Sequence, residues 1–256
     1  MNDAELFARQ HASLRAFYRM LAGGSERGGL LELDGVTAAV SPHVPERSVM
    51  NGVVYEPGGA LAKSLDRLAS TYDEAGVIAW TVWVPPHDRD AARLLDREGH
   101  RLDASPAAMA MELEGLNRLD GALGADVRVE DEADLRDLAR LNDLAYGYDG
   151  SFERALHRLD ADGLNRYVAR VNGEPSACVG TLDHDRDCGV YLVATHADHR
   201  GRGLAGALMT RALLDARERG CATTSLQATA MGRPLYGRLG YRDLGPFEMW
   251  ERRRPA

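Results

Sequence analysis

The pattern of apolar and polar positions divides the chain into alternating helices and strands. Residues 4–21 place Phe7, Leu14 and Leu21 on one stripe, as a helix with a single buried face does. Residues 77–85 are apolar almost throughout, which is typical of a strand buried on both faces. By the same criteria, further strands are predicted at residues 30–40 and 49–55 and in a pair ending at Met111, and further helices at residues 59–74 and 89–97.

A segment with three glycines, residues 115–124, separates this part from a second part with a different order of elements. The second part opens with a short strand and a helix that turns Leu135, Leu138 and Leu141 inward, with Asp131 expected as its N-cap. A second short helix is expected near Phe152, followed by strands at 167–171, 176–182 and 189–195, then a helix, a strand and a short helix that contains Tyr236.

Two blocks of the first part recur in the second part. The helix containing Leu61 matches the helix containing Leu204 (204 − 61 = 143), and residues 94–101 match residues 235–242 (235 − 94 = 141). Repeats of this kind indicate duplicated folding units. The sequence therefore predicts two domains, formed by residues 1–122 and 123–256.

Composition places the chain among ordinary globular proteins. Of its 256 residues, 45% are hydrophobic and 27% charged, and no apolar stretch approaches the roughly 18 residues of a membrane span. The first residues lack the apolar core of a signal peptide, so we expect a cytoplasmic protein without a membrane partner. The net charge of −8 disfavours nucleic acid and favours a cationic small partner. Homo-oligomers remain possible.

The cysteines argue against a disulfide framework or a metal site. There are three of them, Cys178, Cys188 and Cys221, an odd number without the CxxC spacing of zinc ligands. We therefore expect reduced thiols and no bound metal.

The stretch from Tyr191 to Gly206 carries the clearest chemical signal. An apolar strand ends at Thr195, a short polar turn follows, and a glycine-rich step opens an amphipathic helix. The start of a helix leaves backbone N–H groups unpaired and carries a partial positive charge. Arg200 and Arg202 lie at this end, where cations are unfavourable unless an anion joins them. The stretch therefore predicts a phosphate-binding site.

The glycines of this stretch permit two interpretations. Gly201, Gly203 and Gly206 spell GxGxxG, the dinucleotide fingerprint, which requires a glycine directly after the strand and an acidic residue about 20 positions later. Here a polar turn comes between the strand and the glycine, and residues 226–229 contain no acid. The dinucleotide interpretation therefore ranks second.

The other interpretation is the motif Arg-x-x-Gly-x-Ala at residues 200–205, preceded by a strand and followed by a helix, a strand, Tyr236 and a Gly-Tyr pair. This order resembles the GNAT superfamily of acyl-CoA N-acyltransferases, over residues 127–250. The resemblance implies an α/β (α+β) fold of two GNAT-like halves in tandem, each a mixed, mostly antiparallel sheet flanked by helices. On the repeat alignment, the first half has Pro57, Ala60 and Leu95 where the second has Arg200, Gly203 and Tyr236. We therefore expect a degenerate first domain without a coenzyme A site and one catalytic domain.

The resemblance also assigns the parts of an acyl-CoA site. It implies that the pantetheine arm of acetyl-CoA pairs with the strand at Val193 and Thr195, and that the Val193 N–H stabilises the oxyanion. Arg200 belongs to the same cofactor-binding motif. Backbone N–H groups at the start of the helix would hold the pyrophosphate, those of Gly201, Arg202, Gly203, Ala205 and Gly206.

By the same resemblance, Tyr236 protonates the departing thiolate of coenzyme A. A packing role for Tyr236 is the alternative. No general base is assigned, because the position where some family members have a glutamate is Gly189. Tyr191 and Tyr148 are expected to bind the acceptor, since Tyr191 shares a strand face with Val193 and Tyr148 lies in the loop after the first helix of this half.

These expectations combine into one function and one alternative. The sequence predicts an acetyl-CoA-dependent N-acetyltransferase that forms a ternary complex with a small-molecule or peptide amine, which attacks the thioester directly. The alternative is a non-catalytic acyl-CoA sensor or partner-binding module, which the missing glutamate at position 189 favours.

Overall fold

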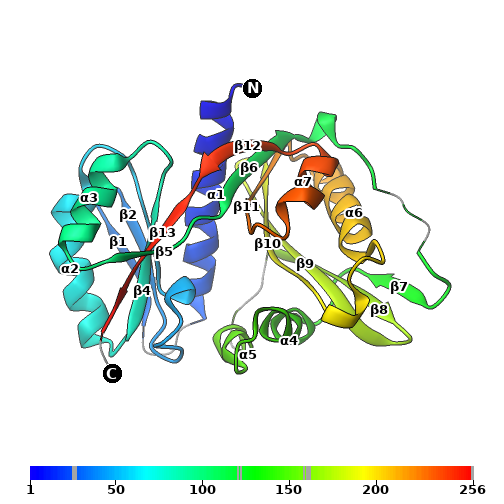
Figure 1. Cartoon of the computed structure of the whole chain (residues 1–256), viewed down its shortest axis with the longest axis horizontal. Helices are drawn as coiled ribbons and strands as arrows, with labels where there is room; N and C mark the ends of the chain where they lie inside the picture. The colour runs from blue at the N-terminus through cyan, green and yellow to red at the C-terminus, as the bar shows by residue number, and fades with distance from the viewer. Residues whose placement is uncertain (25–27, 120, 122, 158, 160–162, 255–256) are drawn as a thin grey trace. The chain divides into compact units, whose positions relative to one another are not determined.

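The computed structural model describes residues 1–24, 28–119, 121, 123–157, 159 and 163–254 (Figure 1). These residues form two compact units, and each unit draws on both ends of the chain. The larger unit contains residues 1–13, 108–157 and 163–244, whereas the smaller unit contains residues 14–107, 159 and 245–254. The predicted domain boundary falls at Ala122, which lies outside the described residues, and stays a prediction.

The smaller unit is a six-stranded sheet in the order β1-β2-β3-β4-β13-β5. Its strands are β1 (Gly29–Leu33), β2 (Val36–Val40), β3 (Gly52–Tyr55), β4 (Ala79–Val84), β5 (Arg101–Ala104) and β13 (Glu248–Arg253). The 3₁₀ helix η1 (Ser48–Met50) precedes β3. All the pairings described within this sheet are antiparallel except β3 with β4.

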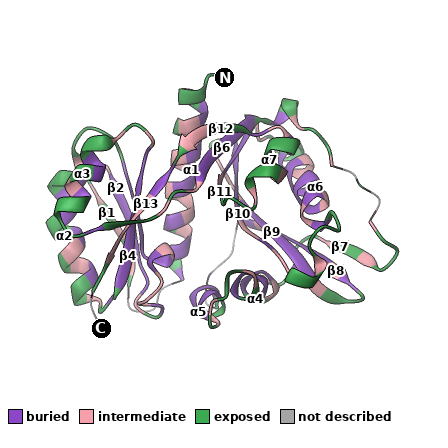
Figure 2. Ribbon diagram, viewed as in Figure 1, coloured by how far each residue is buried: buried purple, intermediate pink, exposed green. Residues whose placement is uncertain are grey.

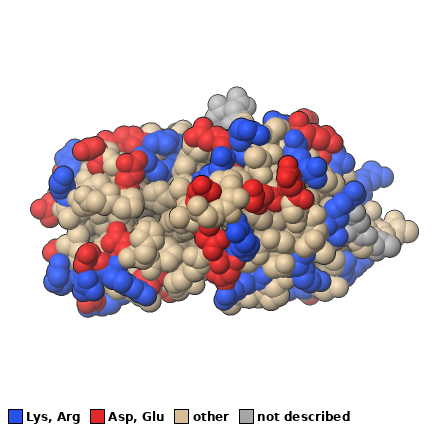
Figure 3. Space-filling view, turned by 90° about the horizontal axis from the view of Figure 1, so that it is seen from above, with Lys and Arg blue, Asp and Glu red and all other residues tan. Residues whose placement is uncertain are grey.

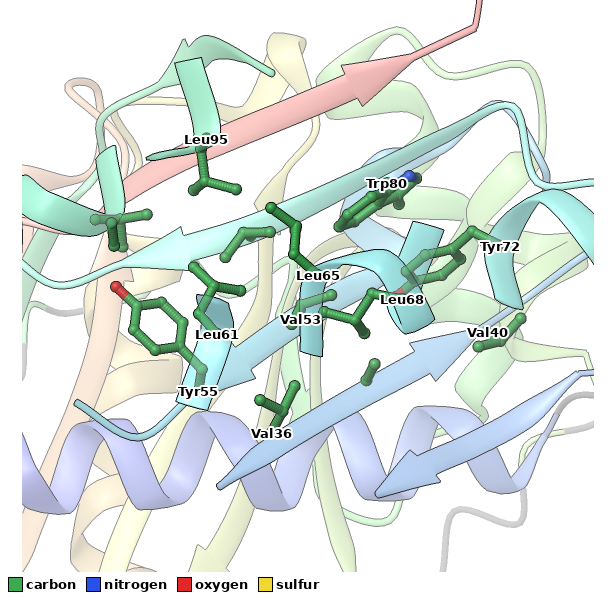
Figure 4. Packing of buried hydrophobic residues seen from close by; sticks show 14 of the residues in the cluster. Val36, Val40, Val53, Tyr55, Leu61, Leu65, Leu68, Tyr72, Trp80 and Leu95 are labelled. Carbon is green, nitrogen blue, oxygen red and sulfur yellow. The ribbon is translucent and has the colours of Figure 1, made fainter. Parts of the chain in front are cut away.

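Alternate residues of β4 send their side chains to opposite faces of this sheet. On one face, Trp80 stacks on Tyr72 of α2 (Ala60–Glu74), with 4.8 Å between ring centroids, in the core that α3 (Arg89–Arg97) completes (Figure 4). On the other face, the Trp83 indole donates a 2.7 Å hydrogen bond to the Tyr18 hydroxyl of α1 (Asp3–Gly23). The continuous apolar run predicted for this strand thus reflects helices on both faces.

The expected strand at residues 30–40 is two strands, β1 and β2, joined by a turn at Asp34 and Gly35. Gly35 has a φ of 72°, and a glycine adopts this left-handed conformation without steric cost. Asp-Gly between apolar runs is a strong hairpin signal, so the prediction as one strand was wrong for a reason visible in the sequence.

The larger unit is a seven-stranded sheet in the order β12-β6-β11-β10-β9-β8-β7, with helices packed on it (Figure 2). Its strands are β6 (Ala107–Glu112), β7 (Val127–Glu130), β8 (Leu164–Val171), β9 (Glu174–His184), β10 (Asp187–Thr195), β11 (Thr223–Ala228) and β12 (Arg242–Pro246). Its helices are α4 (Leu135–Tyr146), α5 (Ser151–Leu156), α6 (Leu204–Glu218) and α7 (Arg233–Leu239), with 3₁₀ helices η2 (Leu113–Gly115) and η3 (Ala197–His199).

Helix α4 begins at Leu135, and Asp134 is its N-cap. The Asp134 carboxylate accepts a 2.9 Å hydrogen bond from the Arg136 backbone N–H. Asp131, the predicted cap, lies too early in the chain and forms an ion pair with Arg211 instead. The acidic run DEAD offers several caps, and only the position of the first helical turn selects one.

The structure contains two mixed, mostly antiparallel sheets flanked by helices, which confirms the predicted fold class. They exchange their last strands, which was not predicted. Strand β6, at the end of the first half, lies between β11 and β12, and strand β13, at the end of the second half, lies between β4 and β5. We call this arrangement the strand exchange.

The repeat is visible in α2 and α6, which are both 15 residues long. They begin at Ala60 and Leu204, an offset of 144 residues (204 − 60), and each is capped by a left-handed glycine, Gly59 or Gly203. The alignment of Gly203 with Ala60 was therefore wrong by one position. The first half keeps the glycine at the helix start but has Glu56 in place of Arg200.

Acidic and basic side chains are interspersed on the face drawn in Figure 3, as on an ordinary solvated surface. Among the described residues, no helix combines the length and apolar character needed to cross a lipid bilayer.

Candidate functional site

Strand β10 is paired along only part of one edge. It runs parallel to β11, but the register joins the two strands only from Asp187 opposite Thr223 to Gly189 opposite Ser225. Both strands continue for several residues beyond this point. The second half of β10 therefore offers unpaired backbone groups on the side facing β11, where an extended ligand can pair with them.

The other edge of β10 contains a β-bulge at the same level. Tyr191 lies opposite Gly180 and Ala194 lies opposite Cys178, so Leu192 and Val193 share one partner residue in β9. Leu192 has a φ of 53°, an uncommon left-handed conformation for a branched side chain. Such strain often marks a functional segment, because a bulge redirects the backbone groups around it.

Helix α4 holds the bulge in place with two side chains one turn apart. The Asn142 amide donates a 3.1 Å hydrogen bond to the Leu192 carbonyl, and the Tyr146 hydroxyl donates a 3.3 Å bond to the Val193 carbonyl. These two bonds fix the orientation of the peptide groups around Val193. Sequence reasoning missed Asn142 and did not give Tyr146 this role, because their partners are backbone carbonyls that exist only once the bulge forms.

The turn after β10 leads into an open helix start. Gly203 caps α6 without any side-chain hydrogen bond, and the first intrahelical bond runs from the Ala207 N–H to the Gly203 carbonyl at 3.0 Å. A Cβ added to Gly201 or Gly203 would meet no atom within 4 Å, so the space beside this backbone is open. This geometry suits a phosphate group at the helix N-terminus. Gly206 differs, because it packs against Leu119.

The side chains of the two motif arginines already have partners within the protein. The Arg200 Nε donates a 3.4 Å hydrogen bond to the Thr195 carbonyl. Arg202 forms a 2.8 Å ion pair with Asp126, and this pair lowers the pKa of the Asp126 carboxyl. Arg202 therefore already has an anionic partner within the protein. Its position at the helix start is weaker evidence for a bound phosphate than the sequence alone indicated.

Tyr236 lies on α7 with its ring against Gly232 and edge-on to Tyr241, with 5.8 Å between the two ring centroids. Only 7% of the residue is exposed. Burial raises the pKa of Tyr236 well above its ordinary value, and the nearby Tyr146 raises it further. The hydroxyl has no hydrogen-bond partner among the described residues, so Tyr236 is a protonated phenol with a free donor near the residue that holds the bulge.

Tyr148, which the sequence predicts as an acceptor-binding residue, lies in a row of three aromatic rings. It stacks on Phe152 at 5.3 Å between centroids and on Tyr146 at 6.0 Å. The buried Asp143 accepts hydrogen bonds from the backbone N–H groups of Phe152 and Glu153. The structure thus brings Tyr148 into one cluster with Tyr146, which itself contacts the bulge.

Neither position 189 nor Asp183 supplies a general base for the attacking amine. The Tyr191 hydroxyl lies 2.7 Å from where a Cβ on Gly189 would stand, so the ring covers that position. Asp183 accepts two hydrogen bonds from the Arg219 guanidinium, at 2.6 and 3.0 Å. The base therefore stays unassigned.

Residues 162–243 match the model of the acetyltransferase (GNAT) domain family. That range contains β10, α6 and α7, which carry the bulge, the open helix start and Tyr236. No curated protein matches the sequence.

Several solved structures share the fold along nearly the whole chain. A GCN5-related N-acetyltransferase from Kribbella flavida has a TM-score of 0.64 and 17% identity, covering 95% of this chain and 96% of that one. A tandem GNAT protein from the clavulanic acid biosynthesis pathway has a TM-score of 0.64 and 14% identity, covering 100% and 97%. A functionally unknown protein from Staphylococcus epidermidis has a TM-score of 0.63 and 14% identity, covering 89% and 95%. At such identities these likenesses show a common fold.

Proposed function

Because residues 162–243 match the acetyltransferase (GNAT) domain family, we propose that this chain transfers an acetyl group from acetyl-CoA to a primary amine of a small molecule or peptide. The observation that carries the proposal is the half-paired strand β10, which combines a bulge with an open, glycine-capped helix start. An extended thioester with a diphosphate at its far end matches this combination of features.

Acetyl-CoA would bind through the backbone. The N–H groups at the start of α6, from Gly201 to Gly206, are proposed to hold the pyrophosphate, since open space lies beside Gly201 and Gly203. The pantetheine arm is proposed to lie along the unpaired edge of β10 between Val193 and Thr195. This mode of binding needs few side chains.

The proposed chemistry is direct attack in a ternary complex. The neutral amine nitrogen bonds to the thioester carbonyl carbon and loses one proton to water, and the carbon–sulfur bond then breaks. The Val193 N–H would stabilise the oxyanion, a contribution that is typically about 3 kcal/mol in the transition state. Tyr236 would give its proton to the departing thiolate, since a phenol is protonated at neutral pH and this hydroxyl has no other partner among the described residues.

The first test of the site is ligand binding. Thermal unfolding should be compared with acetyl-CoA, free coenzyme A, NAD and ATP. A ligand at about 100 times its Kd adds roughly 2.7 kcal/mol of stability, which a melting curve resolves. Stabilisation by the coenzyme A compounds alone supports the proposal, whereas stabilisation by NAD would favour a dinucleotide site.

The test of the mechanism is Tyr236→Phe. Loss of the hydroxyl should lower kcat by about 10²–10⁴-fold, because a positioned general acid contributes that much, while acetyl-CoA affinity stays unchanged. The measurement is release of the coenzyme A thiol with a panel of amines, together with calorimetric titration of acetyl-CoA.

Tyr241→Phe is the matched control for this variant. The Tyr241 hydroxyl shares a 2.8 Å hydrogen bond with Thr224, so its removal should cost stability without a comparable loss of kcat. Unchanged turnover in Tyr236→Phe would exclude the assigned acid.

One observation favours the alternative, a non-catalytic acyl-CoA sensor. The position of the family glutamate is Gly189 and is covered by Tyr191, and Asp183 is bound to Arg219. Tight binding of acetyl-CoA with no thiol release across a broad amine panel would support the sensor. Release with any amine would support the enzyme.

A further inference from the structure

The backbone carbonyl of Leu192 is held by two buried side chains that the proposed mechanism does not use. The Cys178 thiol donates a 3.1 Å hydrogen bond to this carbonyl, and the Asn142 amide donates a second one, also at 3.1 Å. Cys178 is fully buried, and Asn142 is 2% exposed. A carbonyl oxygen has two lone pairs, so these two donors are sufficient to occupy both.

Cys178 lies on β9 directly beside the bulge. It is opposite Ala194, whereas the preceding pair in the register joins Tyr191 to Gly180. A bulge interrupts the ladder of hydrogen bonds between two strands. Here the thiol takes the place of the interrupted ladder, because it donates to the Leu192 carbonyl and accepts a hydrogen bond from the Ala194 backbone N–H. One sulfur atom thus bridges the backbone groups on either side of Val193.

Asn142 reaches the same carbonyl from α4. Its amide nitrogen also donates a 2.8 Å hydrogen bond to the Leu138 carbonyl, one turn earlier in the same helix. This bond fixes the side chain against α4, and the second hydrogen of the amide is directed to Leu192. The amide nitrogen lies 3.6 Å from the Cys178 sulfur, so the two donors form one cluster behind the bulge.

The carbonyl of Leu192 and the N–H of Val193 belong to one peptide group. This group is planar and trans, so its C=O and N–H point in opposite directions. Because the carbonyl points to Cys178 of β9, the Val193 N–H points away from β9, toward the edge of β10 that β11 leaves unpaired. The bonds that the carbonyl accepts therefore set the direction in which the N–H donates.

The same bonds polarise the peptide group. A hydrogen bond accepted by a carbonyl makes the N–H of that group a stronger donor, and the effect is larger in buried surroundings than in water. Burial raises the pKa of Cys178 to about 12, and the hydrogen bond from Ala194 opposes this rise. The thiol therefore remains a donor even in the alkaline solutions in which an amine is neutral and reactive.

We propose that Cys178 and Asn142 are positioning residues for acyl transfer, which hold and polarise the Leu192–Val193 peptide group so that its N–H is aimed at the oxyanion. This inference rests on the proposed function, because it concerns the donor that the proposed mechanism assigns to Val193. Both side chains act through the peptide group. Their bonds also offset the cost of the left-handed conformation of Leu192, whose φ is 53°.

The sequence supplies a probe for this single peptide group. Leucine is followed by valine only at positions 192 and 193, so protein labelled with ¹³C-carbonyl leucine and ¹⁵N-valine gives one carbonyl-to-amide correlation in an NMR spectrum. Cys178→Ala and Asn142→Leu should each shift this signal, because the carbonyl loses a hydrogen bond. Cys178→Ser keeps a donor and should shift it less than Cys178→Ala does. An unchanged signal in both Cys178→Ala and Asn142→Leu would overturn the proposal.

Turnover measures the effect on the reaction. Cys178→Ala should lower kcat by roughly 10- to 100-fold, which is less than the loss of an entire oxyanion donor costs, because the N–H remains but is less well aimed. The Kd of acetyl-CoA, measured by calorimetric titration, should stay near that of the parent. Cys178→Ser should recover most of the lost kcat. The assay is release of the coenzyme A thiol with the panel of amines.

Cys188→Ala is the matched control. Cys188 is as fully buried as Cys178, but it lies at the start of β10, opposite Asp183 and Thr224 and before the bulge. Loss of its thiol should cost stability, while kcat and the Leu192–Val193 signal stay unchanged. Equal loss of kcat in Cys178→Ala and Cys188→Ala would contradict the proposal, since removal of any buried thiol would then slow the reaction.

The parent protein separates this inference from the proposed function. A parent that releases no thiol with any amine would remove the proposed function and this inference with it. An active parent whose kcat is unchanged by Cys178→Ala and by Asn142→Leu would overturn this inference alone.

Discussion

The side chain of Tyr191 fills the space that any side chain at position 189 would need. A Cβ on Gly189 would lie 2.7 Å from the Tyr191 hydroxyl and 2.8 Å from its Cε2 atom, and both distances are shorter than real contacts. The two positions are on the same face of β10. Glycine at position 189 therefore leaves the room that the Tyr191 ring occupies, and a larger residue there would need that ring to move.

Introducing the glutamate should therefore destabilise the protein. We expect Gly189→Glu to lower the free energy of unfolding by about 1–3 kcal/mol, because the new side chain forces Tyr191 out of its position. In a Tyr191→Gly background the space is free, so Gly189→Glu should lower the free energy of unfolding less there than it does in the parent. Urea unfolding of both variants measures the difference. A single variant as stable as the parent would mean that the ring moves aside at no cost.

His100 makes the smaller unit sensitive to acid. It is fully buried, edge-on to Trp80 at 4.6 Å between centroids. Burial lowers the pKa of His100 to about 4, and the charge of Arg252 contributes. In the unfolded chain the pKa is about 6.5, so protons bind the unfolded state first as the pH falls. The neutral ring therefore contributes its full stability above pH 6.5. As the pH falls toward 4, the free energy of unfolding decreases by up to about 3 kcal/mol.

This sensitivity should disappear in His100→Phe. Between pH 7 and pH 5, the free energy of unfolding of the parent should fall more than that of the variant, because the variant has no group to protonate at this position. Urea unfolding at the two pH values measures the effect. Equal pH dependence in both proteins would show that other groups cause the acid sensitivity.

At the scale of elements, the sequence predicted most helices and strands but not which strands pair. Residues 59–74 and 77–85 have patterns strong enough to fix a helix and a buried strand, and α2 and β4 confirm them. Pairing is different, because β13 joins β4 and β5 across more than 140 residues of chain (248 − 104). Local periodicity contains no information on so distant a partner.

Contacts between distant parts of the chain were also what the sequence did not predict at the candidate site. The glycines around α6 and Tyr236 could be predicted from a motif because their spacing along the chain is short. Asn142 could not be, since it acts on a bulge carbonyl 50 residues away. A polar residue at an inward position of the helix, next to Leu138 and Leu141, was the one signal in the sequence that could have found it.

Removal of β13 should unfold the sheet of the smaller unit. A chain truncated after Pro246 loses the strand between β4 and β5, with the contact of Phe247 and Trp83 at 5.2 Å between ring centroids. We expect amide protons in β4 and β5 to lose protection in hydrogen exchange, because both strands gain a free edge. A chain truncated after Arg254 keeps the strand and should retain protection. Full protection after the longer truncation would contradict a structural role for β13.

At the scale of the whole molecule, the strand exchange means that strands from both halves of the chain are combined in each sheet. A division at residue 122 would leave the sheet of the smaller unit without β13 and that of the larger unit without β6. The repeat therefore predicts the number of sheets correctly, whereas neither half of the repeat contains all the strands of one sheet. A duplicated sequence specifies two similar units but does not specify from which copy each unit takes its last strand.

The strand exchange also governs when the protein can fold during its synthesis. Domains usually fold as units as they leave the ribosome, the N-terminal one first. Here β4 and β5 are made early, but the strand that fills the space between them is made only when residues 248–253 are added. Until then both strands carry unpaired backbone groups, which are templates for pairing with neighbouring chains on the same messenger RNA. The sheet of the smaller unit therefore stays incomplete until the second half of this sequence has been made.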